Sequence, residues 1–239
     1  MLVEFQDIQK RFGQKLALDV PSWTMQPGEI VGLVGSNGAG KTTFLRLLLD
    51  LLAPDTGEVR IDGTPVSQDG AWRASTGSYL DASFMVDFLT IPEFIEFTGA
   101  AYGLGKAEMA ARIHPLSNFL PVDSVDRSRL LRDLSTGNAK KVGIAVALAV
   151  RPRLLVLDEP FANLDPPSQL RLKEHLLRMS REHGTTMLIS SHDLGYVTEI
   201  CNRITLIRRG AILRDEARSE VTLERLRAYF SDEDAADVT

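Results

Sequence analysis

The feature that most constrains this chain is the octapeptide Gly-Ser-Asn-Gly-Ala-Gly-Lys-Thr at residues 35–42. An apolar run, Ile30 to Val34, precedes it, and a stretch with helical character, Thr43 to Leu52, follows it. Strand, glycine-rich turn and helix in this order form the context that a phosphate-binding loop requires. The alternative is an accidental match, which at ordinary glycine usage is on the order of one in a hundred for this length. The flanking elements favour phosphate binding.

The residue types of this loop suit an anionic ligand. Its glycines let the backbone bend tightly and bring N–H groups close to a phosphate. The helix that starts at Lys41 adds the positive end of its dipole and its unpaired N–H groups. We expect Lys41 to reach the β- and γ-phosphates of a nucleotide, and the Thr42 hydroxyl to bind Mg²⁺. The predicted phosphate-binding residues are Gly35, Ser36, Asn37, Gly38, Ala39, Gly40, Lys41, Thr42 and Thr43.

The pattern along the chain predicts an α/β fold. Antiparallel strands are expected at Leu2 to Ile8 and Leu16 to Trp23, joined by a turn at residues 11–14. From residue 81 to 150 the character is helical. Further strands are expected at residues 58–62, 77–80, 154–157, 185–189, 203–207 and 211–214, with helices at 91–102, 106–113, 139–149, 168–182, 195–201 and 222–230. We therefore expect a core of residues 1–80 and 151–218, an inserted helical lobe of residues 81–150, and a C-terminal helix with an acidic tail at 219–239.

Net charge and hydrophobicity limit the kinds of partner that the chain can bind directly. A net charge of −5 gives no broadly basic surface, so no direct contact with nucleic acid is expected. Apolar stretches such as Ala145 to Val150 are far shorter than the ~20 residues that a membrane span needs. If the chain works at a membrane, it is expected to dock to another polypeptide there.

Three polar residues at expected strand ends complete the candidate chemistry. Asp158 follows the apolar run 154–157 and is the expected second Mg²⁺ ligand, opposite Thr42. Glu159 comes next, where a carboxylate can orient and deprotonate the attacking water. His192, after the strand expected at 185–189, can sense a γ-phosphate by hydrogen bonding. Carboxylates at strand ends often only cap the next helix, but their pairing with the loop at 35–42 favours the functional interpretation.

Taken together, five segments resemble the ATP-binding subunit of ABC transporters. They occur in the family's order and span nearly the whole chain, roughly Val3 to Arg214. Leu-Ser-Thr-Gly-Asn at 134–138 is the family-specific element and resembles the signature motif, usually Leu-Ser-Gly-Gly-Gln. The segments are Gly35 to Thr42, Leu134 to Asn138, Leu154 to Pro160, Asn163 to Asp165, and His192.

The resemblance implies a P-loop NTPase core with a mostly parallel sheet, an N-terminal antiparallel subdomain and an inserted helical subdomain. It also implies roles for individual residues. Phe12 falls where the family stacks an aromatic ring on adenine, although a half-buried turn residue was the simpler interpretation. Asp158 and Glu159 match the Walker B aspartate and catalytic glutamate, Asp165 the D-loop, and His192 the switch histidine.

The resemblance further implies that one chain holds half of each site. Ser135 and Gly137, at a helix N-terminus, would face the γ-phosphate of ATP bound to a second copy. Two chains, a homodimer by expectation, would then enclose two ATP with Mg²⁺ and drive separate transmembrane permease subunits. This predicts an ATPase that is peripheral to the cytoplasmic face of a membrane.

The sequence departs from the family in two places. The signature carries Thr136 and Asn138 in place of glycine and glutamine. The family usually has a glutamine where the chain enters the helical lobe, but residues 78–83 contain none, and Asp81 is the candidate to replace it. Just beyond, Phe84, Met85, Phe88 and Leu89 either fill the core of the lobe or line a groove for a cytoplasmic helix of a membrane partner.

Three functions remain to be compared. The first is a transporter motor, by resemblance an exporter. The second is a soluble ABC ATPase that acts on nucleic acid or ribosomes; the lack of a coiled-coil insertion between Gly35 and Leu134, and the single ATPase unit, argue against it. The third is a nucleotide-dependent dimer that barely hydrolyses ATP, which Glu159 and His192 argue against.

Overall fold

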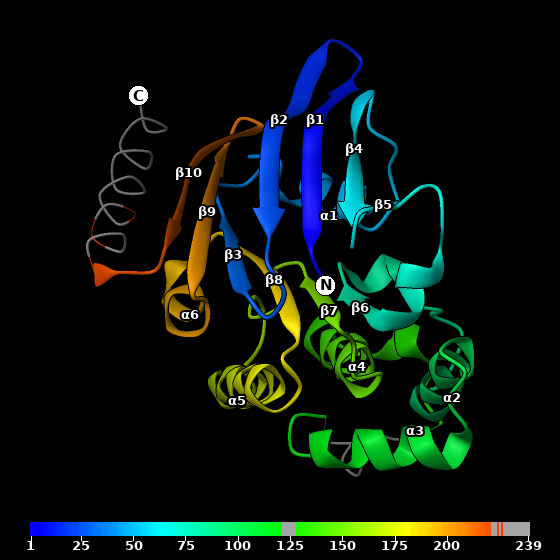
Figure 1. The fold of residues 1–239 in the computed structure, drawn as a ribbon. Helices are drawn as coiled ribbons and strands as arrows, with labels where there is room; N and C mark the ends of the chain where they lie inside the picture. Colours follow the sequence, from blue (N-terminus) through cyan, green and yellow to red (C-terminus); the bar gives the residue numbers. More distant parts are fainter. Residues whose placement is uncertain (121–127, 221–223, 225, 227–239) are drawn as a thin grey trace.

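The chain folds around one mixed β-sheet. The computed structural model describes residues 1–120, 128–220, 224 and 226. Among these residues, ten strands join in the order β5-β4-β1-β2-β10-β9-β3-β8-β7-β6 (Figure 1). The expected α/β fold, with a parallel part and an antiparallel part, is therefore confirmed.

Five strands at one side of the sheet run parallel. They are β9 (Arg203–Arg208), β3 (Ile30–Val34), β8 (Thr186–Ser191), β7 (Leu154–Leu157) and β6 (Thr76–Tyr79). Every residue of β3, β7 and β8 is buried, because side groups pack on both faces of a parallel sheet. The apolar runs at residues 30–34 and 154–157 form strands with the predicted bounds.

The remaining five strands continue the same sheet, with antiparallel pairing except between β10 and β2, which is parallel. They are β1 (Val3–Phe12), β2 (Lys15–Met25), β4 (Thr56–Ile61), β5 (Thr64–Pro65) and β10 (Ala211–Ala217). The predicted turn at residues 11–14 was too long. A register shift between Lys10 and Arg11 lets the β1–β2 pairing run on to Phe12 and Lys15, so only Gly13 and Gln14 form the turn.

Helices pack on both faces of the sheet, and alternate strand residues point to each side. Leu154 and Val156 of β7 share a core with α1 (Lys41–Leu48) and the antiparallel strands. Leu155 and Leu157 share the other core with the remaining helices. Those helices are α2 (Ile91–Ala101), α3 (Lys106–Ile113), α4 (Thr136–Ala149), α5 (Pro166–His183) and α6 (Leu194–Ile200).

Helix ends differ from the sequence-based bounds where caps decide them. The helix α4 begins at Thr136 instead of residue 139, because the Ser135 side chain accepts a hydrogen bond from Asn138 N at 3.3 Å. In the same way Asp165 caps α5, which begins at Pro166. The helix α1 ends at Leu48 rather than residue 52, and Asp50 there has a left-handed φ of 53°.

Short 3₁₀ helices connect the larger elements. They are η1 (Ala71–Ser75), η2 (Ala82–Phe84), η3 (His114–Leu116) and η4 (Leu131–Asp133). Of the helix expected at 222–230, only residues 224 and 226 are described, both helical, and the tail at 231–239 lies outside the described residues.

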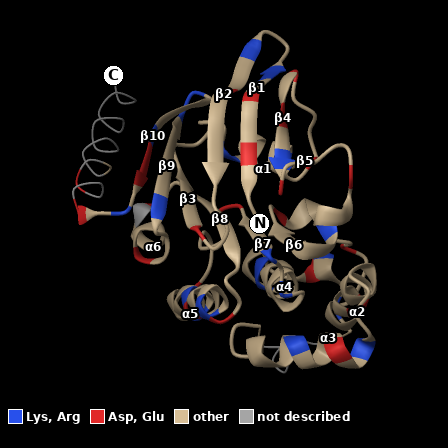
Figure 2. Cartoon of the chain, in the orientation of Figure 1, with Lys and Arg blue, Asp and Glu red and all other residues tan. Residues whose placement is uncertain are grey.

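Charged residues of both signs are spread over the molecule. Lys, Arg, Asp and Glu are interspersed over the strands and helices rather than gathered by sign (Figure 2). No helix in the described part of the chain is both long and apolar enough to cross a bilayer.

Candidate functional site

The candidate site lies where three neighbouring parallel strands end. The loop 35–42 follows β3, Asp158 and Glu159 follow β7, and His192 follows β8. Because these strands run in the same direction and lie side by side in the order β3-β8-β7, their carboxyl ends meet at one edge. Ligands of α/β sheets bind at this kind of edge.

The loop 35–42 has the backbone geometry that its glycines permit. Gly40 has a φ of 113° and is the N-cap of α1, so α1 begins at Lys41. At Gly35 a Cβ atom would lie 2.3 Å from Ile207 O, which excludes any side chain. The loop therefore presents the positive end of α1 at the carboxyl edge of the sheet.

Lys41 is buried beneath this loop. Its side chain Nζ donates to Gly35 O at 2.7 Å and Ser36 O at 3.2 Å, and the residue is 6% exposed. Glu159 Oε1 lies 3.4 Å from the same Nζ, an ion-pair distance without the alignment of a hydrogen bond. The ammonium group is thus held where the loop curls around it.

Asp158 joins the loop to the neighbouring strands. Its Oδ2 accepts a hydrogen bond from Thr42 Oγ1 at 2.7 Å, and its Oδ1 accepts one from Ser190 Oγ. The backbone N–H of Asp158 donates to Tyr79 O of β6 at 2.9 Å. The residue is 7% exposed, so three elements fix this carboxylate in a buried network.

Glu159 stands in an unusual backbone conformation. Its φ is 47°, a left-handed value that a residue with a Cβ seldom adopts and that often marks functional sites. Its N–H donates to Ser190 Oγ at 2.9 Å, and its Oε2 lies 2.9 Å from Nδ1 of the half-exposed His192. The carboxylate is thereby placed between Lys41 and His192.

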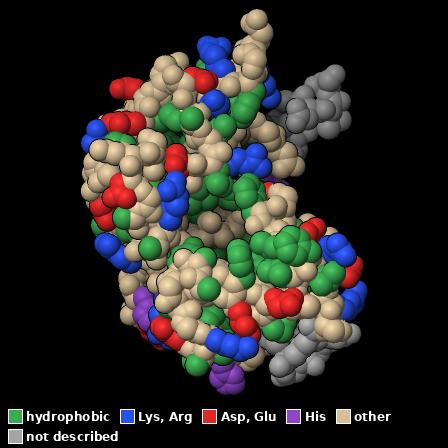
Figure 3. Space-filling view, turned by 90° about the vertical axis from the view of Figure 1, so that its right-hand side faces the viewer, with side chains coloured by type: hydrophobic (Ala, Val, Ile, Leu, Met, Phe, Trp, Pro, Cys, Tyr) green, Lys and Arg blue, Asp and Glu red, His purple; other side chains and the backbone are tan. Residues whose placement is uncertain are grey.

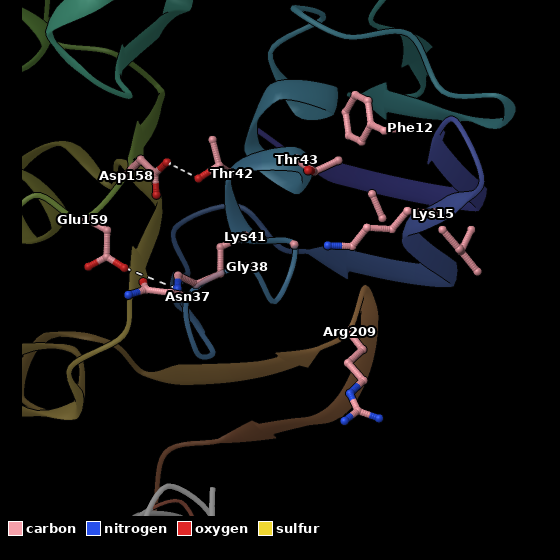
Figure 4. Close-up of a pocket in the computed structure, with 13 residues that line it drawn as sticks. Phe12, Lys15, Asn37, Gly38, Lys41, Thr42, Thr43, Asp158, Glu159 and Arg209 are labelled. Carbon is pink, nitrogen blue, oxygen red and sulfur yellow. Dashed lines mark hydrogen bonds and ion pairs between the residues drawn. The ribbon is translucent and has the colours of Figure 1, made fainter. Parts of the chain in front are cut away.

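A cavity of about 660 Å³ opens over these groups. Figure 4 shows Asp158 and Thr42 at one end and Phe12 with Lys15 at the other. The cavity is lined by Phe12, Lys15, Leu16, Ala17, Asn37, Gly38, Gly40, Lys41, Thr42, Thr43, Asp158, Glu159 and Arg209.

The end of the cavity near Phe12 is open to solvent. The Phe12 side chain is 53% exposed, and Phe12 is the last residue of β1, directly before the turn. The Lys10 ammonium lies 5.9 Å from its ring centroid, and Lys15 is its cross-strand partner in the β1–β2 pairing. An exposed ring beside a phosphate loop is suited to stack on a flat heterocycle.

Seven predicted site residues do not line this cavity: Gly35, Ser36, Ala39, His192, Ser135, Gly137 and Asp165. The first three belong to the loop 35–42 itself and His192 contacts Glu159, whereas the last three lie on other elements. Ser135 caps α4 and Gly137 lies in its first turn, where an added Cβ would be 3.1 Å from Asn163 O. Asp165 caps α5, accepting from Ser168 N at 2.9 Å, and pairs with Lys141 Nζ at 2.7 Å. The hydrogen bond from Lys141, followed by those from Ser168, holds the Asp165 pKa well below its ordinary value.

The donor set fits a magnesium ion with few protein ligands. Thr42 Oγ1 and Asp158 Oδ2 are hard oxygen atoms 2.7 Å apart, beside a cavity large enough for a nucleotide. Among the described residues, no group of three or more His, Cys, Asp and Glu is arranged to hold a metal. Mg²⁺ needs no such cage, because it usually keeps waters and binds one or two protein ligands plus phosphate oxygens.

Sequence reasoning missed several residues that shape the site. Lys15 and Arg209 line the cavity, and Ser190 supports both Asp158 and Glu159. Ser190 stood beside His192 at a predicted strand end, a position that carries this signal. Lys15 becomes visible only through its pairing with Phe12 across the hairpin.

A second groove, of about 310 Å³, lies between β6, η2, α2 and α4, and Leu51, beyond the end of α1, also lines it. Phe84 and Phe97 line it and are half exposed, whereas Phe88 does not line it. Asp81, the candidate for the missing glutamine, also lines it; its side chain accepts from Ser83 N at 2.7 Å and lies 4.0 Å from Arg46. Figure 3 shows hydrophobic side chains gathered around a hollow on the face that carries α2.

The loop 35–42, its buried lysine and the Thr42–Asp158 pair define the chain as a P-loop nucleoside triphosphatase by fold and site. The profile of the ABC transporter family matches residues 18–162. The chain belongs to that family, as one of its ATP-binding ATPase subunits.

Three curated relatives illustrate the range of the family. An ABC transporter ATP-binding protein of Synechocystis is 34% identical over 201 residues, 84% of this chain and 56% of the relative, so this chain spans little more than half of that protein. The Nod factor export ATP-binding protein I of Paraburkholderia xenovorans is 33% identical, over 91% of this chain and 71% of the relative. The sulfate/thiosulfate import protein CysA of Pseudomonas aeruginosa is 31% identical, over 92% and 68%.

Solved structures share the fold. The structure of an ATP-binding subunit of an ABC transporter aligns with a TM-score of 0.83 and 27% identity, over 97% of this chain and 94% of that one. A bacterial ABC transporter cassette solved as a dimer aligns with a TM-score of 0.82 and 23% identity, over 91% and 99%. The P-loop NTPase core with its inserted helices is the fold of these proteins.

Proposed function

We propose that this chain is the ATP-hydrolysing motor of an ABC transporter, in which two copies enclose two ATP and drive separate membrane subunits that export a cargo. The observation that carries the proposal is the position of Glu159, between Lys41 and His192 and next to the Thr42–Asp158 pair. These groups supply a phosphate clamp, metal-binding oxygens and a base around a single cavity.

The residues act together on the γ-phosphate. The loop N–H groups and Lys41 neutralise the phosphate oxygens, and Phe12 stacks on the adenine. Glu159 orients a water and takes its proton as the water oxygen attacks the γ-phosphorus and ADP departs. His192 donates to the γ-phosphate and holds Glu159 by its Nδ1 contact. Mg²⁺, bound by Thr42 and Asp158, would neutralise charge on the β- and γ-phosphates.

A second copy would complete each site. Ser135, Gly137 and Asp165 lie outside the cavity of their own chain, at the first turns of α4 and α5. The N-terminus of α4 offers N–H groups to an anion, and in a head-to-tail pair it would reach the partner's γ-phosphate. The cassette solved as a dimer agrees with the pairing of two copies.

The membrane partner would dock at the groove beside α2. We assign residues 1–80 and 151–218 to the ATP-binding core, 81–150 to the helical lobe and 219–239 to a C-terminal extension. The groove lies where core and lobe meet, and Phe84 and Phe97 expose apolar surface there. An amphipathic helix of a permease fits this surface, so the chain would sit peripherally at the cytoplasmic face. The name of the Nod factor relative agrees with export, whereas CysA is an importer.

Two measurements test the motor. Steady-state ATP turnover of Glu159→Gln should fall by about a hundredfold or more, because the general base is lost. The same variant should form dimers with ATP and Mg²⁺ in size-exclusion chromatography, since binding is retained. Equal turnover in wild type and variant would contradict the catalytic role. A variant that stays monomeric at high concentration, and also beside its membrane subunit, would contradict the shared site.

Docking is tested by crosslinking. Single cysteines placed at positions 84 and 97, in a Cys201→Ser background, should crosslink to a co-expressed membrane subunit, whereas a cysteine at position 213 on exposed β10 should not. The absence of crosslinks under every nucleotide condition would argue against the groove.

A further inference from the structure

The helix α4 carries two adjacent lysines in an otherwise small and apolar sequence. Lys140 and Lys141 are 8% and 9% exposed, and every residue of α4 from Ala139 to Ala149 is buried. Buried lysines are uncommon unless their charge is paired or their ammonium is hydrogen-bonded. Lys141 pairs with the Asp165 carboxylate. Within the part of the chain that the structure describes, Lys140 has no carboxylate oxygen at ion-pair distance, and its ammonium donates to backbone carbonyls.

Lys140 instead holds two backbone carbonyls. Its Nζ donates to Glu159 O and to Ala162 O, each at 2.8 Å. Both carbonyls belong to the segment between β7 and α5, which contains the proposed general base Glu159. Two charge-assisted hydrogen bonds from one buried ammonium are among the stronger fixed contacts that a turn can receive.

This turn needs external support. Glu159 and Asn163 have φ values of 47° and 61°, and such left-handed residues with a Cβ persist only when their surroundings hold them. The N–H of Glu159 is held by Ser190 Oγ at 2.9 Å, and its carbonyl accepts from Ala162 N at 3.2 Å and from Lys140. Glu159 is therefore fixed on both sides of its Cα, by β8 and by α4.

Burial and nearby carboxylates act on the charge of Lys140 in opposite directions. Burial holds the pKa of Lys140 below its ordinary value, and the nearby carboxylates of Glu159 and Asp158 offset only part of this lowering. An ammonium at this place is thus stabilised by the same acidic groups that the site uses. A neutral, apolar side chain of the same length would leave Ala162 O without its lysine donor and free the turn to relax.

We propose that Lys140 is a positioning residue for hydrolysis, fixing the turn that aims the Glu159 carboxylate toward the phosphate end of the cavity. The inference rests on the proposed function, since it assumes that Glu159 is the general base. It adds a link between elements: the helix capped by Ser135, proposed to meet the partner's ATP, also supports the base of its own site. One rigid helix would then serve both half-sites.

The test is the kinetics of Lys140→Met, an apolar substitution of nearly equal length. We expect kcat for ATP to fall by about tenfold or more with KM within about twofold, because a misplaced base slows chemistry while binding is kept. Lys140→Gln, whose amide donors sit on a shorter chain, should be intermediate, lower than wild type by about threefold or more. The matched control is Lys173→Met on α5; this lysine pairs with Glu199, neither residue lines the cavity, and kcat should not change.

A double variant separates positioning from general destabilisation. In the Glu159→Gln background, Lys140→Met should cause no further loss of the residual turnover, because its effect passes through the Glu159 side chain. A further tenfold loss there, or a parallel rise of KM in both backgrounds, would show a structural role and overturn the proposal. Unchanged kcat in folded Lys140→Met would also overturn it.

The controls keep the two proposals apart. Thermal unfolding checks whether Lys140→Met is folded. If it is not, Lys140→Gln replaces it in the test, and a wild-type kcat in that folded variant overturns the inference. If Glu159→Gln keeps wild-type turnover, the general base has been misassigned and the proposed function fails. If Glu159→Gln is inactive but folded Lys140→Met keeps the wild-type kcat, only the positioning role fails.

Discussion

The two ends of the nucleotide cavity are built in different ways. At the phosphate end, Lys41 and Asp158 are 6% and 7% exposed, and each makes at least two hydrogen bonds within the protein. At the other end the Phe12 ring is 53% exposed, and the Lys10 ammonium lies 5.9 Å from its centroid. One end is a buried polar network, and the other is an exposed aromatic surface.

The difference follows from what each end has to do. Charge that develops on a phosphate is stabilised best by dipoles and cations that are already fixed and partly removed from water. A base needs only a flat surface, because stacking tolerates variation in position and in the identity of the base. The phosphate end is therefore expected to control chemistry, and the Phe12 end to contribute a modest part of affinity.

The largest expected effect is at the phosphate end. Lys41→Met should weaken ATP binding by about a hundredfold or more, because it removes a buried cation from the loop that cradles the phosphates. Fluorescent-nucleotide titration measures this effect, and thermal unfolding checks that the variant folds. ATP affinity within a few-fold of wild type in the folded variant would show that the loop N–H groups suffice without the lysine.

At the open end the effect should be smaller and of another kind. Phe12→Ala should raise the KM for ATP by about tenfold while kcat stays the same, since one stacking contact contributes about 1–3 kcal/mol and this ring is exposed. Phe12→Trp, which keeps a stacking surface, should retain the wild-type KM. A fall in kcat in Phe12→Ala would show that the two ends are coupled.

The same contrast explains what the sequence revealed. The phosphate loop, Asp158 and Glu159 were predicted because each is contiguous with a strand or helix whose pattern is visible locally. Buried parallel strands have unbroken apolar runs, so their carboxyl ends, and the residues placed there, can be read directly. The half-site at Ser135 was reached through the family resemblance instead.

Residues that act across the fold could not be predicted in this way. Lys140 reaches Glu159 from a separate helix, and Lys15 faces the cavity because a register shift extends the β1–β2 hairpin. Neither contact follows from local pattern, because each depends on how distant segments pack. The exposure of Phe12 was likewise open, since a turn residue and a stacking residue have the same sequence signal.

A smaller effect is expected outside the cavity, at the N-terminus of α5, the helix that follows the segment containing Glu159. Asp165 caps α5 and its pKa is held below the ordinary 3.8, chiefly by Lys141. A carboxylate with a lowered folded pKa adds stability above its unfolded pKa, and this is lost as the pH falls through the folded value. Asp165→Asn keeps the cap but loses the charge, so it should be less stable by about 1 kcal/mol or less at neutral pH.

Urea unfolding of both proteins checks this assignment. The difference between wild type and Asp165→Asn should be constant from pH 7 down to about pH 5 and shrink below the ordinary pKa. Groups that titrate alike in both proteins cancel in the difference. A gap that persists unchanged at about pH 3 would mean that hydrogen-bond geometry, and not the charge, stabilises this end.

The smallest effect should come from Lys15, which lies beside Phe12 at the open end. Figure 4 shows its side chain extending from the hairpin toward the loop that contains Gly38, and the residue is exposed. An exposed cation contributes about 0.2–1 kcal/mol to a nearby anion, so Lys15→Gln should raise the KM for ATP by at most about fivefold. Salt should erase the difference, because the Debye length shrinks to about 3 Å at 1 M. The matched control is Lys106→Gln on α3, which should not change KM. If the Lys15 effect survives high salt, this lysine belongs to the fixed phosphate network, and the boundary between the two ends lies closer to Phe12 than the exposure of the side chains indicates.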